Sequence, residues 1–294
     1  MQNQNKFHYK AMMFLSFAGP AVILFSAVVI VPFIFGLYLT FTGWDGISSS
    51  IPFVGFENYL SLFKDTSFWI SLGRTILYAV IAVILANVVA FALAYLVTSK
   101  IKGSNFFRAA FFTPNLIGGI VLGYIWQFVF KQAILVIGKA TGISLFSTSW
   151  LSDPFKAFWA LIIVTVWQLS GYLMLIYIAG LMDVSDDLKE AAKIDGCDEK
   201  KTTRYITLPM MAGTFTICFF LAITRAFVTY DVNISLTEGG PFGSTTLAAM
   251  YVYNMAFSSK KYGLGQAEAL ILFLVIAVIA VTQAFIGKSK EVEA

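Results

Sequence analysis

Polar and aromatic side chains recur inside apolar stretches of this chain at spacings that bring them together on a helix. Gln168 and Tyr172 are four residues apart, and Thr165 shares their helix face. A later apolar stretch carries Arg225 and Thr229, also four residues apart. Amide, hydroxyl and guanidinium groups form hydrogen bonds, while aromatic rings offer flat apolar faces. These five residues are therefore candidates to line a path for a ligand with many hydroxyls and flat C–H faces, as a sugar has.

Each of these side chains also has a purely structural interpretation. Trp167 and Tyr172 can pack between helices, and Gln168 can bond a neighbouring helix. An arginine at the centre of a membrane helix costs about 2.5–3.5 kcal/mol, so Arg225, nearer one end, either snorkels to water or faces a path. An anionic sugar would give Arg225 or Arg74 a charge partner, and a neutral oligosaccharide is the alternative that the sequence leaves open.

The composition shows which environment must position these residues. The chain has 294 residues, of which 59% are hydrophobic and only 12% charged, whereas a soluble domain carries about 25% charged residues. This polar surface is too small for a water-soluble particle, so we expect an all-α integral membrane protein. The basic residues behind the net charge of +4 are then expected to set the orientation in the membrane rather than to bind nucleic acid. Cys197, Cys218 and His8 match no metal-binding spacing, and we expect no metal and no catalytic residue.

Charge-free runs long enough to cross a bilayer, which takes about 20 residues, predict six transmembrane helices. Their approximate bounds are 11–41, 72–99, 107–130, 157–182, 208–230 and 266–287. The apolar stretch Gln132–Gly138 is too short to cross, so it is interpreted as part of an outer loop or an interfacial turn. The whole of 1–294 is expected to form one transmembrane domain.

Basic residues predict the orientation of these spans. One side of the membrane holds short, densely basic segments, containing Lys6, Lys10, Lys100, Lys102, Arg108, Lys288 and Lys290. The loops on the other side are longer and sparser in basic residues. Both termini are therefore expected in the cytoplasm. The loop from about Asp231 to Leu264, with its turn-forming "TEGGPFGST", is expected outside.

A polar segment, "EAAKIDGCDEKKTTRYITLPMM", separates the fourth and fifth predicted spans on the cytoplasmic side. Ser185 is a suitable helix cap and Gly196 a suitable stop, which predicts a helix over 185–196. Leu188, Ala191 and Ala192 would share one shallow face. So short a helix is marginal alone in water, so it needs a surface to pack on. That surface is either another protein or the lipid headgroups.

The spacing of "EAAKIDG…ITLP" resembles the signature loop of permease subunits of ATP-driven importers. The matching residues are Glu190, Ala191, Ala192, Asp195, Gly196, Ile206, Leu208 and Pro209. In that family the short helix docks into a cleft on a separate ATPase subunit and transmits its motion. The resemblance implies a type I importer fold, with ATPase coupling through Leu188, Glu190, Ala191, Ala192, Asp195, Gly196, Leu208 and Pro209. Pro209, tolerated in a first helical turn, would pass the motion to the fifth span. Cys197 and Thr203 depart from the residues common at their positions, which affects fine packing.

Further stretches, such as "FLSFAGPAVILF", "FVGFENYLSLFKDTSFW" and "FFTPNLIGGIVLGYIWQFVF", resemble the carbohydrate-importing subgroup. This subgroup includes the larger permease subunit of the maltose transporter, whose extra N-terminal spans and large insert are lacking here. The resemblance places Thr165, Gln168, Leu169, Tyr172, Arg225, Ala226 and Thr229 beside the sugar. It implies as partners a second homologous permease, a dimer of ATP-binding subunits that holds ATP and Mg²⁺, and an extracellular sugar-binding protein. It implies a cell-membrane location, with no cofactor in this chain and no nucleic acid.

Two other classes of function compete with an ATP-driven importer. The nearest approach to a P-loop, "AILVIGKA", lacks the required first glycine and the Ser or Thr, so the energy source is expected in another subunit. That absence also fits an ion-driven secondary transporter. Such a transporter predicts acids or histidines inside the spans, and the charge-free runs have none. A membrane scaffold that transports nothing would need neither a polar path nor a docking helix.

Overall fold

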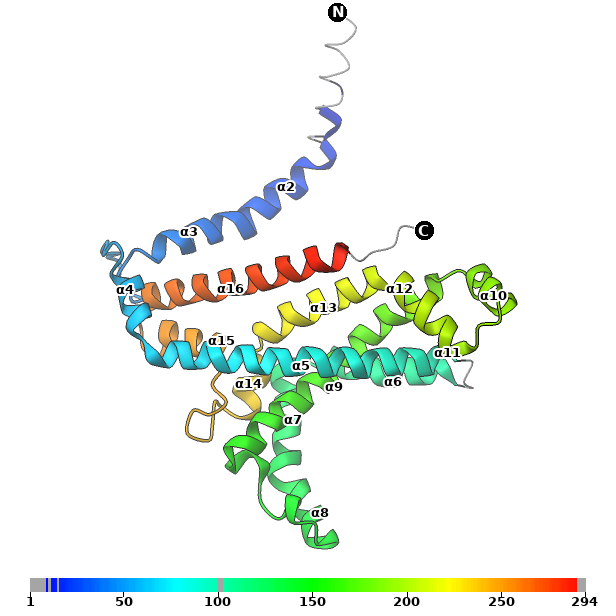
Figure 1. Cartoon of the computed structure of the whole chain (residues 1–294). Coiled ribbons are helices and arrows are strands. Elements are labelled where there is room, and N and C mark those ends of the chain that lie inside the picture. The colour runs from blue at the N-terminus through cyan, green and yellow to red at the C-terminus, as the bar shows by residue number, and fades with distance from the viewer. Residues whose placement is uncertain (1–8, 10–11, 15, 100–102, 290–294) are drawn as a thin grey trace, which may run out of the picture. The chain divides into compact units, whose positions relative to one another are not determined.

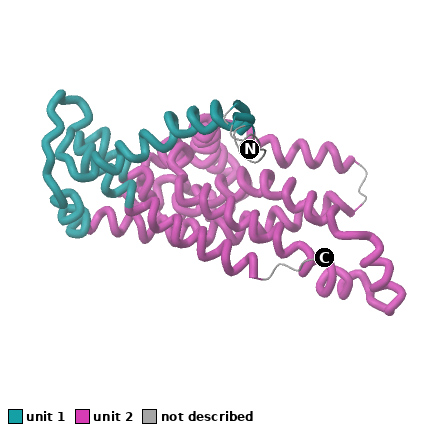
Figure 2. The backbone as a smooth tube through the Cα atoms, turned by 90° about the horizontal axis from the view of Figure 1, so that it is seen from above, with its two compact units in different colours: residues 1–65, 252–270 teal, residues 66–251, 271–294 magenta. Residues whose placement is uncertain are grey.

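A computed structural model of the chain describes residues 9, 12–14, 16–99 and 103–289. His8 lies outside the described residues. So do several residues on which the predicted orientation rests, namely Lys6, Lys10, Lys100, Lys102 and Lys290. Within the described part the backbone is helical apart from loops, and strand-like pairing is limited to one bridge between Thr42 and Phe53. The chain divides into two compact units, residues 1–65 with 252–270 and residues 66–251 with 271–294 (Figure 2).

The first unit contains the first span and the loop that follows it. Helix α2 (Gly19–Phe25), a π-helical turn (Ser26–Ile30) and α3 (Val31–Leu39) form one continuous apolar helix. Residues 12–14, 16 and 17, inside the predicted span 11–41, are helical as well. After a loop, α4 (Glu57–Lys64) returns to it. The amide of Asn58 in α4 donates to the carbonyl oxygens of Thr40 and Thr42, each at 2.8 Å, so the loop is tied back to the end of the span.

The second unit is built on three packed helices, α5 (Thr66–Thr98), α9 (Pro154–Asp183) and α13 (Ala212–Phe227), with α6 (Ser104–Leu116) against α9 (Figure 1). Small residues permit this close packing. A Cβ atom on Gly171 of α9 would lie 1.9 Å from the carbonyl oxygen of Phe111 in α6. Deep between the helices, the hydroxyl of Tyr177 donates to Asn87 Oδ1 at 2.7 Å. This polar bond joins α9 to α5.

The predicted third span, 107–130, is broken in the structure. Helix α6 ends at Leu116, and Ile117 and Gly118 are extended, with ψ of 127° and 139°. A new helix then runs without interruption over Gly119–Thr141, made of α7 (Gly119–Phe128), a π-helical turn (Val129–Ala133) and α8 (Ile134–Thr141). The stretch Gln132–Gly138 is therefore helical, not the loop or interfacial turn that its short apolar run indicated. Two short 3₁₀ turns, Ser144–Phe146 and Trp150–Ser152, lead on to α9.

The fifth span is bent. After α10 (Asp186–Ile194), α11 (Glu199–Thr202), a π-helical turn (Thr203–Thr207) and α12 (Leu208–Met210) form one helical segment. This segment meets α13 at an angle of 65°. Pro209 lies in the segment before the bend, whereas the sequence predicted it in the first turn of the span. Counting the bent pair as one span, the described residues contain six helices able to cross a membrane.

The chain ends in three helices, α14 (Asp231–Leu236), α15 (Ala248–Tyr253, followed by a π-helical turn, Asn254–Ser258) and α16 (Tyr262–Lys288). Helix α16 and the predicted span 266–287 both contain Glu268, although the charge-free run in this part of the sequence begins only after that residue. The Glu268 side chain is completely buried, and among the described residues neither carboxylate oxygen has a hydrogen-bond partner. A buried acid therefore lies in a span, so the charge-free runs alone do not exclude a secondary transporter.

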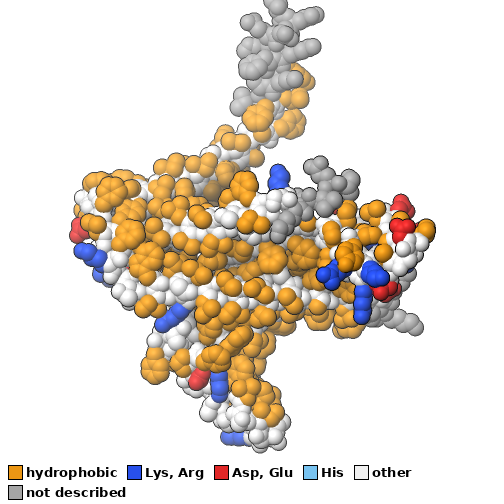
Figure 3. All heavy atoms as spheres, in the orientation of Figure 1, with side chains coloured by type: hydrophobic (Ala, Val, Ile, Leu, Met, Phe, Trp, Pro, Cys, Tyr) orange, Lys and Arg blue, Asp and Glu red, His pale blue; other side chains and the backbone are white. Residues whose placement is uncertain are grey.

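Charged side chains gather over α10 and α11, whereas the long helices show a mostly apolar face in the same view (Figure 3). This separation is what a bilayer requires, because a charged side chain in hydrocarbon is costly.

Candidate functional site

A cavity of about 620 Å³ opens in the second unit where α7, α9, α13 and α14 come together. Its size lies in the range of small-molecule sites. Hydroxyl, amide and charged groups converge on it: the lining residues are Gly119, Thr165, Gln168, Leu169, Thr224, Arg225, Val228, Thr229, Tyr230, Asp231 and Val232. By contrast, a second cavity, of about 650 Å³ between α13 and α16, is lined mainly by apolar side chains. Only the first offers the convergent polar groups that fix a polar ligand.

The break in the third span forms one wall of this cavity. The extended backbone at Ile117 and Gly118 interrupts the helical hydrogen bonds, and the Gln168 amide donates to the carbonyl oxygen of Ile117 at 3.2 Å. Non-helical backbone at membrane depth is tolerated where such a partner or a cavity satisfies it. A Cβ atom on Gly119 would lie 2.7 Å from Cβ of Asp231. Glycine at 119 therefore lets α7 approach the start of α14.

Arg225 is held by two contacts. Its Nη1 donates to Asn115 Oδ1 at 2.9 Å, and its Cζ lies 4.3 Å from the centre of the Tyr172 ring. A guanidinium has five N–H donors, and the Arg225 side chain remains exposed at the cavity. Arg225 can therefore donate to a ligand from a fixed position.

Two threonines of the cavity are fixed from behind by a buried tyrosine. The hydroxyl of Tyr78 in α5 lies 2.6 Å from Thr165 Oγ1 and donates to Thr229 Oγ1 at 3.5 Å. Tyr78 is fully buried. The hydroxyl of Thr229 also donates to the Arg225 carbonyl at 3.2 Å. One side chain of α5 thus holds together groups from α9 and from the end of α13.

The structure brings together most of the residues that the sequence singled out. Thr165, Gln168, Arg225 and Thr229 line the cavity, as does Leu169. Tyr172 lies behind Arg225 as a support, and Ala226 is buried.

The site residues predicted from the sequence did not include three polar lining residues, Thr224, Tyr230 and Asp231. Asp231 is the last residue of the stretch "TRAFVTYD", which also contains the predicted Arg225 and Thr229, and its closeness in sequence to them was the available signal. Helical spacing could not find Asp231, because α13 ends at Phe227 and a new helix begins at Asp231.

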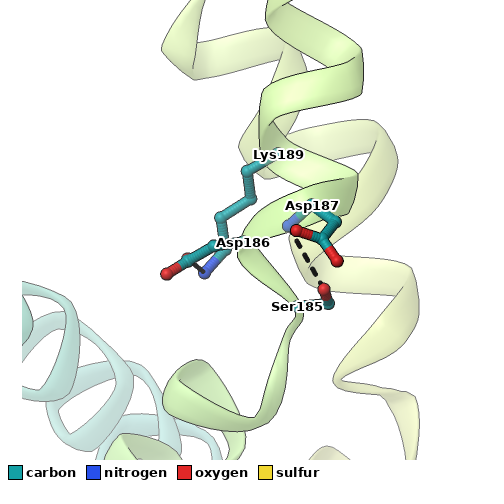
Figure 4. Close-up of polar contacts among 4 residues, drawn as sticks. All are labelled: Ser185, Asp186, Asp187 and Lys189. Carbon is teal, nitrogen blue, oxygen red and sulfur yellow. Dashed lines mark hydrogen bonds and ion pairs between the residues drawn. The ribbon is translucent and has the colours of Figure 1, made fainter.

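The predicted docking helix is formed as α10, and Figure 4 shows the polar contacts at its N-terminal end. Ser185 Oγ accepts the backbone N–H of Asp187 at 3.2 Å, and Lys189 Nζ pairs with Asp186 Oδ1 at 3.0 Å. Gly196 has φ of +82° and donates its N–H to the Lys193 carbonyl at 3.1 Å. Glycine adopts this conformation without the penalty of a Cβ atom. The local sequence alone therefore accounts for both ends of the helix.

The exposed face of α10 differs from the expected one. Ala192 is buried, with 5% of its surface exposed, and so does not share an open face with Leu188 and Ala191. Leu188 is 40% exposed and Ile194 is 87% exposed. Glu190, Asp195 and Pro209 are exposed as well, and Leu208 is half-buried. The open surface of α10 is therefore a set of apolar side chains, including the unpredicted Ile194, among acids.

The family of binding-protein-dependent transport system inner membrane components matches residues 86–291. The chain belongs to this family. It is 41% identical over 293 residues, covering 100% of both chains, to the probable starch degradation products transport system permease protein AmyD of Thermoanaerobacterium thermosulfurigenes. It is 34% identical to the multiple sugar-binding transport system permease protein MsmF of Streptococcus mutans, over 89% of this chain and 90% of that one.

A solved bacterial ABC transporter that imports the acidic polysaccharide alginate contains a chain with the same fold. The TM-score is 0.83 and the identity 18%, over 98% of this chain and 99% of that one. The fold class predicted from the sequence, an all-α type I importer permease, is confirmed. The permease is a multi-pass membrane subunit of a transport system. This family membership excludes a membrane scaffold that transports nothing, and it favours a binding-protein-dependent transporter over an ion-driven secondary transporter.

Proposed function

We propose that this permease carries a neutral oligosaccharide into the cell through a path that it encloses with a second, homologous permease. An extracellular binding protein delivers the sugar, and a dimer of ATP-binding subunits drives the cycle. ATP and Mg²⁺ are held by that dimer, and this chain contributes no catalytic residue.

The chemistry of the 620 Å³ cavity carries this proposal. Thr165, Gln168 and Thr229 offer neutral donors and acceptors that match sugar hydroxyls. Arg225 donates to oxygen, and Asp231 accepts from hydroxyl groups. Because one cation and one anion line the same cavity, its formal charge is balanced. An acidic sugar would bring a second carboxylate beside Asp231, which like-charge repulsion disfavours.

The names of the relatives agree with a neutral sugar. AmyD is described as a permease for starch degradation products and MsmF as one for multiple sugars. Starch fragments carry no charge. The likeness to the alginate transporter, at 18% identity, concerns the fold.

Coupling to the ATPase would pass through α10. Its exposed Leu188 and Ile194 offer apolar contacts to a cleft, and Glu190 lies on the same short helix. A displacement of α10 would move the segment Glu199–Met210 that follows it. Because this segment meets α13 at 65°, its movement would tilt α13. Helix α13 leads into Arg225 and Thr229 at the cavity. Alternating access then follows as two packings of the same helices.

This scheme requires α10 and both termini in the cytoplasm. The basic residues on that side, such as Lys193, Lys200 and Lys201, support this orientation by the positive-inside rule. Accessibility of single cysteines at Ser185 and at Ser259, both exposed, to a membrane-impermeant reagent tests it.

The test of function is uptake by the reconstituted importer. This permease, its sister and the ATPase are placed in proteoliposomes with the cognate binding protein outside. We expect ATP-dependent accumulation of labelled maltotriose but not of labelled trigalacturonate. Uptake of the acidic sugar alone would overturn the neutral substrate, and ATP-independent uptake would overturn the coupling.

A further inference from the structure

The segment 237–248, which is the loop after α14 together with the first residue of α15, presents an aromatic side chain to its surroundings. Phe242 is 97% exposed. Its φ is +55°, in the left-handed region that a bulky residue rarely adopts. Such conformations persist only where the surrounding structure imposes them, and they concentrate at functional sites.

The loop is held rigidly by its own hydrogen bonds. Thr245 Oγ1 lies 2.8 Å from both Thr237 Oγ1 and the Gly240 carbonyl oxygen, and its one hydroxyl hydrogen is donated within this pair of contacts. The completely buried Asn233 donates from Nδ2 to the Thr245 carbonyl at 2.8 Å. The exposure of Phe242 is therefore a fixed feature of an ordered loop.

The tip of this loop belongs in water rather than in lipid. Glu238, on the same loop, is exposed, and a charged side chain facing hydrocarbon is costly. Arg74 Nη1 donates to the Gly243 carbonyl at 2.5 Å. Helix α5 has 33 residues, whereas about 20 cross the hydrocarbon core, so the start of α5 projects beyond it with the loop. A rigid aromatic exposed to water is a typical anchor of a protein–protein interface.

The same loop is connected to the cavity through one face of α5. Thr75 Oγ1 accepts the backbone N–H of Ala248 at 2.8 Å. One turn further along α5, the Tyr78 hydroxyl contacts Thr165 and Thr229 of the cavity. A displacement of the loop by a docked protein would therefore act on Thr75, and α5 would pass it to the cavity threonines.

We propose that Phe242 anchors the sugar-loaded binding protein, and that Thr75 and Tyr78 transmit its docking from the 237–248 loop to the cavity. This inference rests on the proposed function, because it requires the loop to lie outside the cell. The family is binding-protein-dependent, so a partner of this kind must contact the outer side of the permease.

The docking experiment measures ATP hydrolysis by the complete importer in nanodiscs as binding protein is added. For Phe242→Ala we expect the concentration of binding protein at half-maximal stimulation to rise at least tenfold, with basal hydrolysis unchanged, and for Phe242→Tyr a value near wild type. The matched control is Phe53→Ala, because Phe53 is also exposed, at 70%, in the first outer loop. An unchanged value for Phe242→Ala, or an equal rise for Phe53→Ala, overturns the anchor.

Cross-linking identifies the occupant directly. A benzophenone amino acid at position 242 is expected to capture the binding protein on illumination. Capture of the sister permease or of lipid instead overturns the proposal.

The transmission step predicts a different change. Tyr78→Phe and Thr75→Val should lower the maximal stimulation of ATP hydrolysis at least threefold without changing the concentration of binding protein at half-maximal stimulation. Thr75→Ser keeps the hydroxyl and should give the wild-type maximum. Wild-type maxima for both substitutions overturn the transmission. A wild-type importer that the binding protein does not stimulate would refute the proposed function itself, whereas a stimulated importer with an indifferent Phe242 refutes this inference alone.

Discussion

The guanidinium of Arg225 lies over the ring of Tyr172, with its Cζ 4.3 Å from the ring centre. The two residues come from different helices, α13 and α9, and Asn115 of α6 holds the same guanidinium from the side at 2.9 Å. An arginine that sequence alone could assign either to snorkelling or to a path is thus fixed by three helices at the edge of a polar cavity.

Replacement of the ring should weaken sugar binding modestly. A cation–π contact contributes about 0.5–1 kcal/mol at an exposed site, so Tyr172→Leu should raise the sugar concentration for half-maximal uptake by roughly two- to fivefold. Tyr172→Phe keeps the ring face and should change it little. Arg225→Gln should have the larger effect, because it removes the donor itself. If the sugar concentration for half-maximal uptake is the same for Tyr172→Leu as for wild type, the Tyr172 ring does not position Arg225 for sugar binding.

The approach of α6 to α9 predicts a sharp difference between two glycines. At Gly171 a Cβ atom would collide with the Phe111 carbonyl at 1.9 Å, whereas at Gly73, also inside a long helix, it would meet nothing within 4 Å. Gly171→Ala should therefore lower the melting temperature in detergent by several degrees, because overpacking costs about 1–3 kcal/mol. Gly73→Ala should leave it equal or slightly higher, because alanine favours helix by about 1 kcal/mol. Equal melting temperatures for the two variants would contradict this packing.

The sequence predicts the membrane class and the number of spans well, because charge-free length is a direct requirement of the bilayer. It also predicts α10, whose cap at Ser185 and stop at Gly196 are local signals. The broken third span could not be predicted in this way, because Ile117 and Gly118 are as apolar as their neighbours. The break follows Pro114 in the last turn of α6, and the Ile117 carbonyl beyond it is satisfied by Gln168, a residue distant in sequence.

The residues of the polar cavity could be predicted only in part, because some of them come from elements that are distant in the sequence. Helical spacing finds Gln168 and Thr165 because they lie on one helix. It cannot find Tyr78, which reaches the threonines from another span, or Asp231, which lies past a helix end. Burial of Ala192 in place of the expected open face likewise depends on the tertiary packing of α10.

The loop that follows the first span should be insensitive to pH in the physiological range. Two backbone N–H groups, of Ser48 and Ile47, donate to the Asp45 carboxylate at 2.8 and 2.9 Å, and they lower its pKa from the ordinary 3.8 to about 2. Because the pKa is depressed in the folded loop, the carboxylate stabilises the turn above about pH 4 and loses this effect as the pH falls toward 2.

Trp44, whose Nε1 donates to the Ser48 carbonyl at 2.8 Å, provides the readout for this loop. Emission of Trp44, with the other tryptophans replaced by phenylalanine, should be constant from pH 8 to 5 and change below pH 4. Asp45→Asn should abolish that change. A transition between pH 5 and 7 that Asp45→Asn removes would contradict the assignment.

The end of α10 gives the most direct test of coupling. Gly196 has φ of +82°, and a Cβ atom there would meet nothing within 4 Å, so a substitution acts through the backbone alone. A left-handed conformation costs a residue with a side chain about 1–2 kcal/mol. Valine at 196 should therefore displace the end of α10, lower sugar uptake at least tenfold and abolish the stimulation of ATP hydrolysis by the binding protein, with normal membrane insertion. Gly103, at the start of α6, has φ of +86° and equally open surroundings, which makes Gly103→Val a control with the same backbone strain away from α10. If both variants lose stimulation to the same extent, the loss reflects general destabilisation, and α10 is not the coupling element.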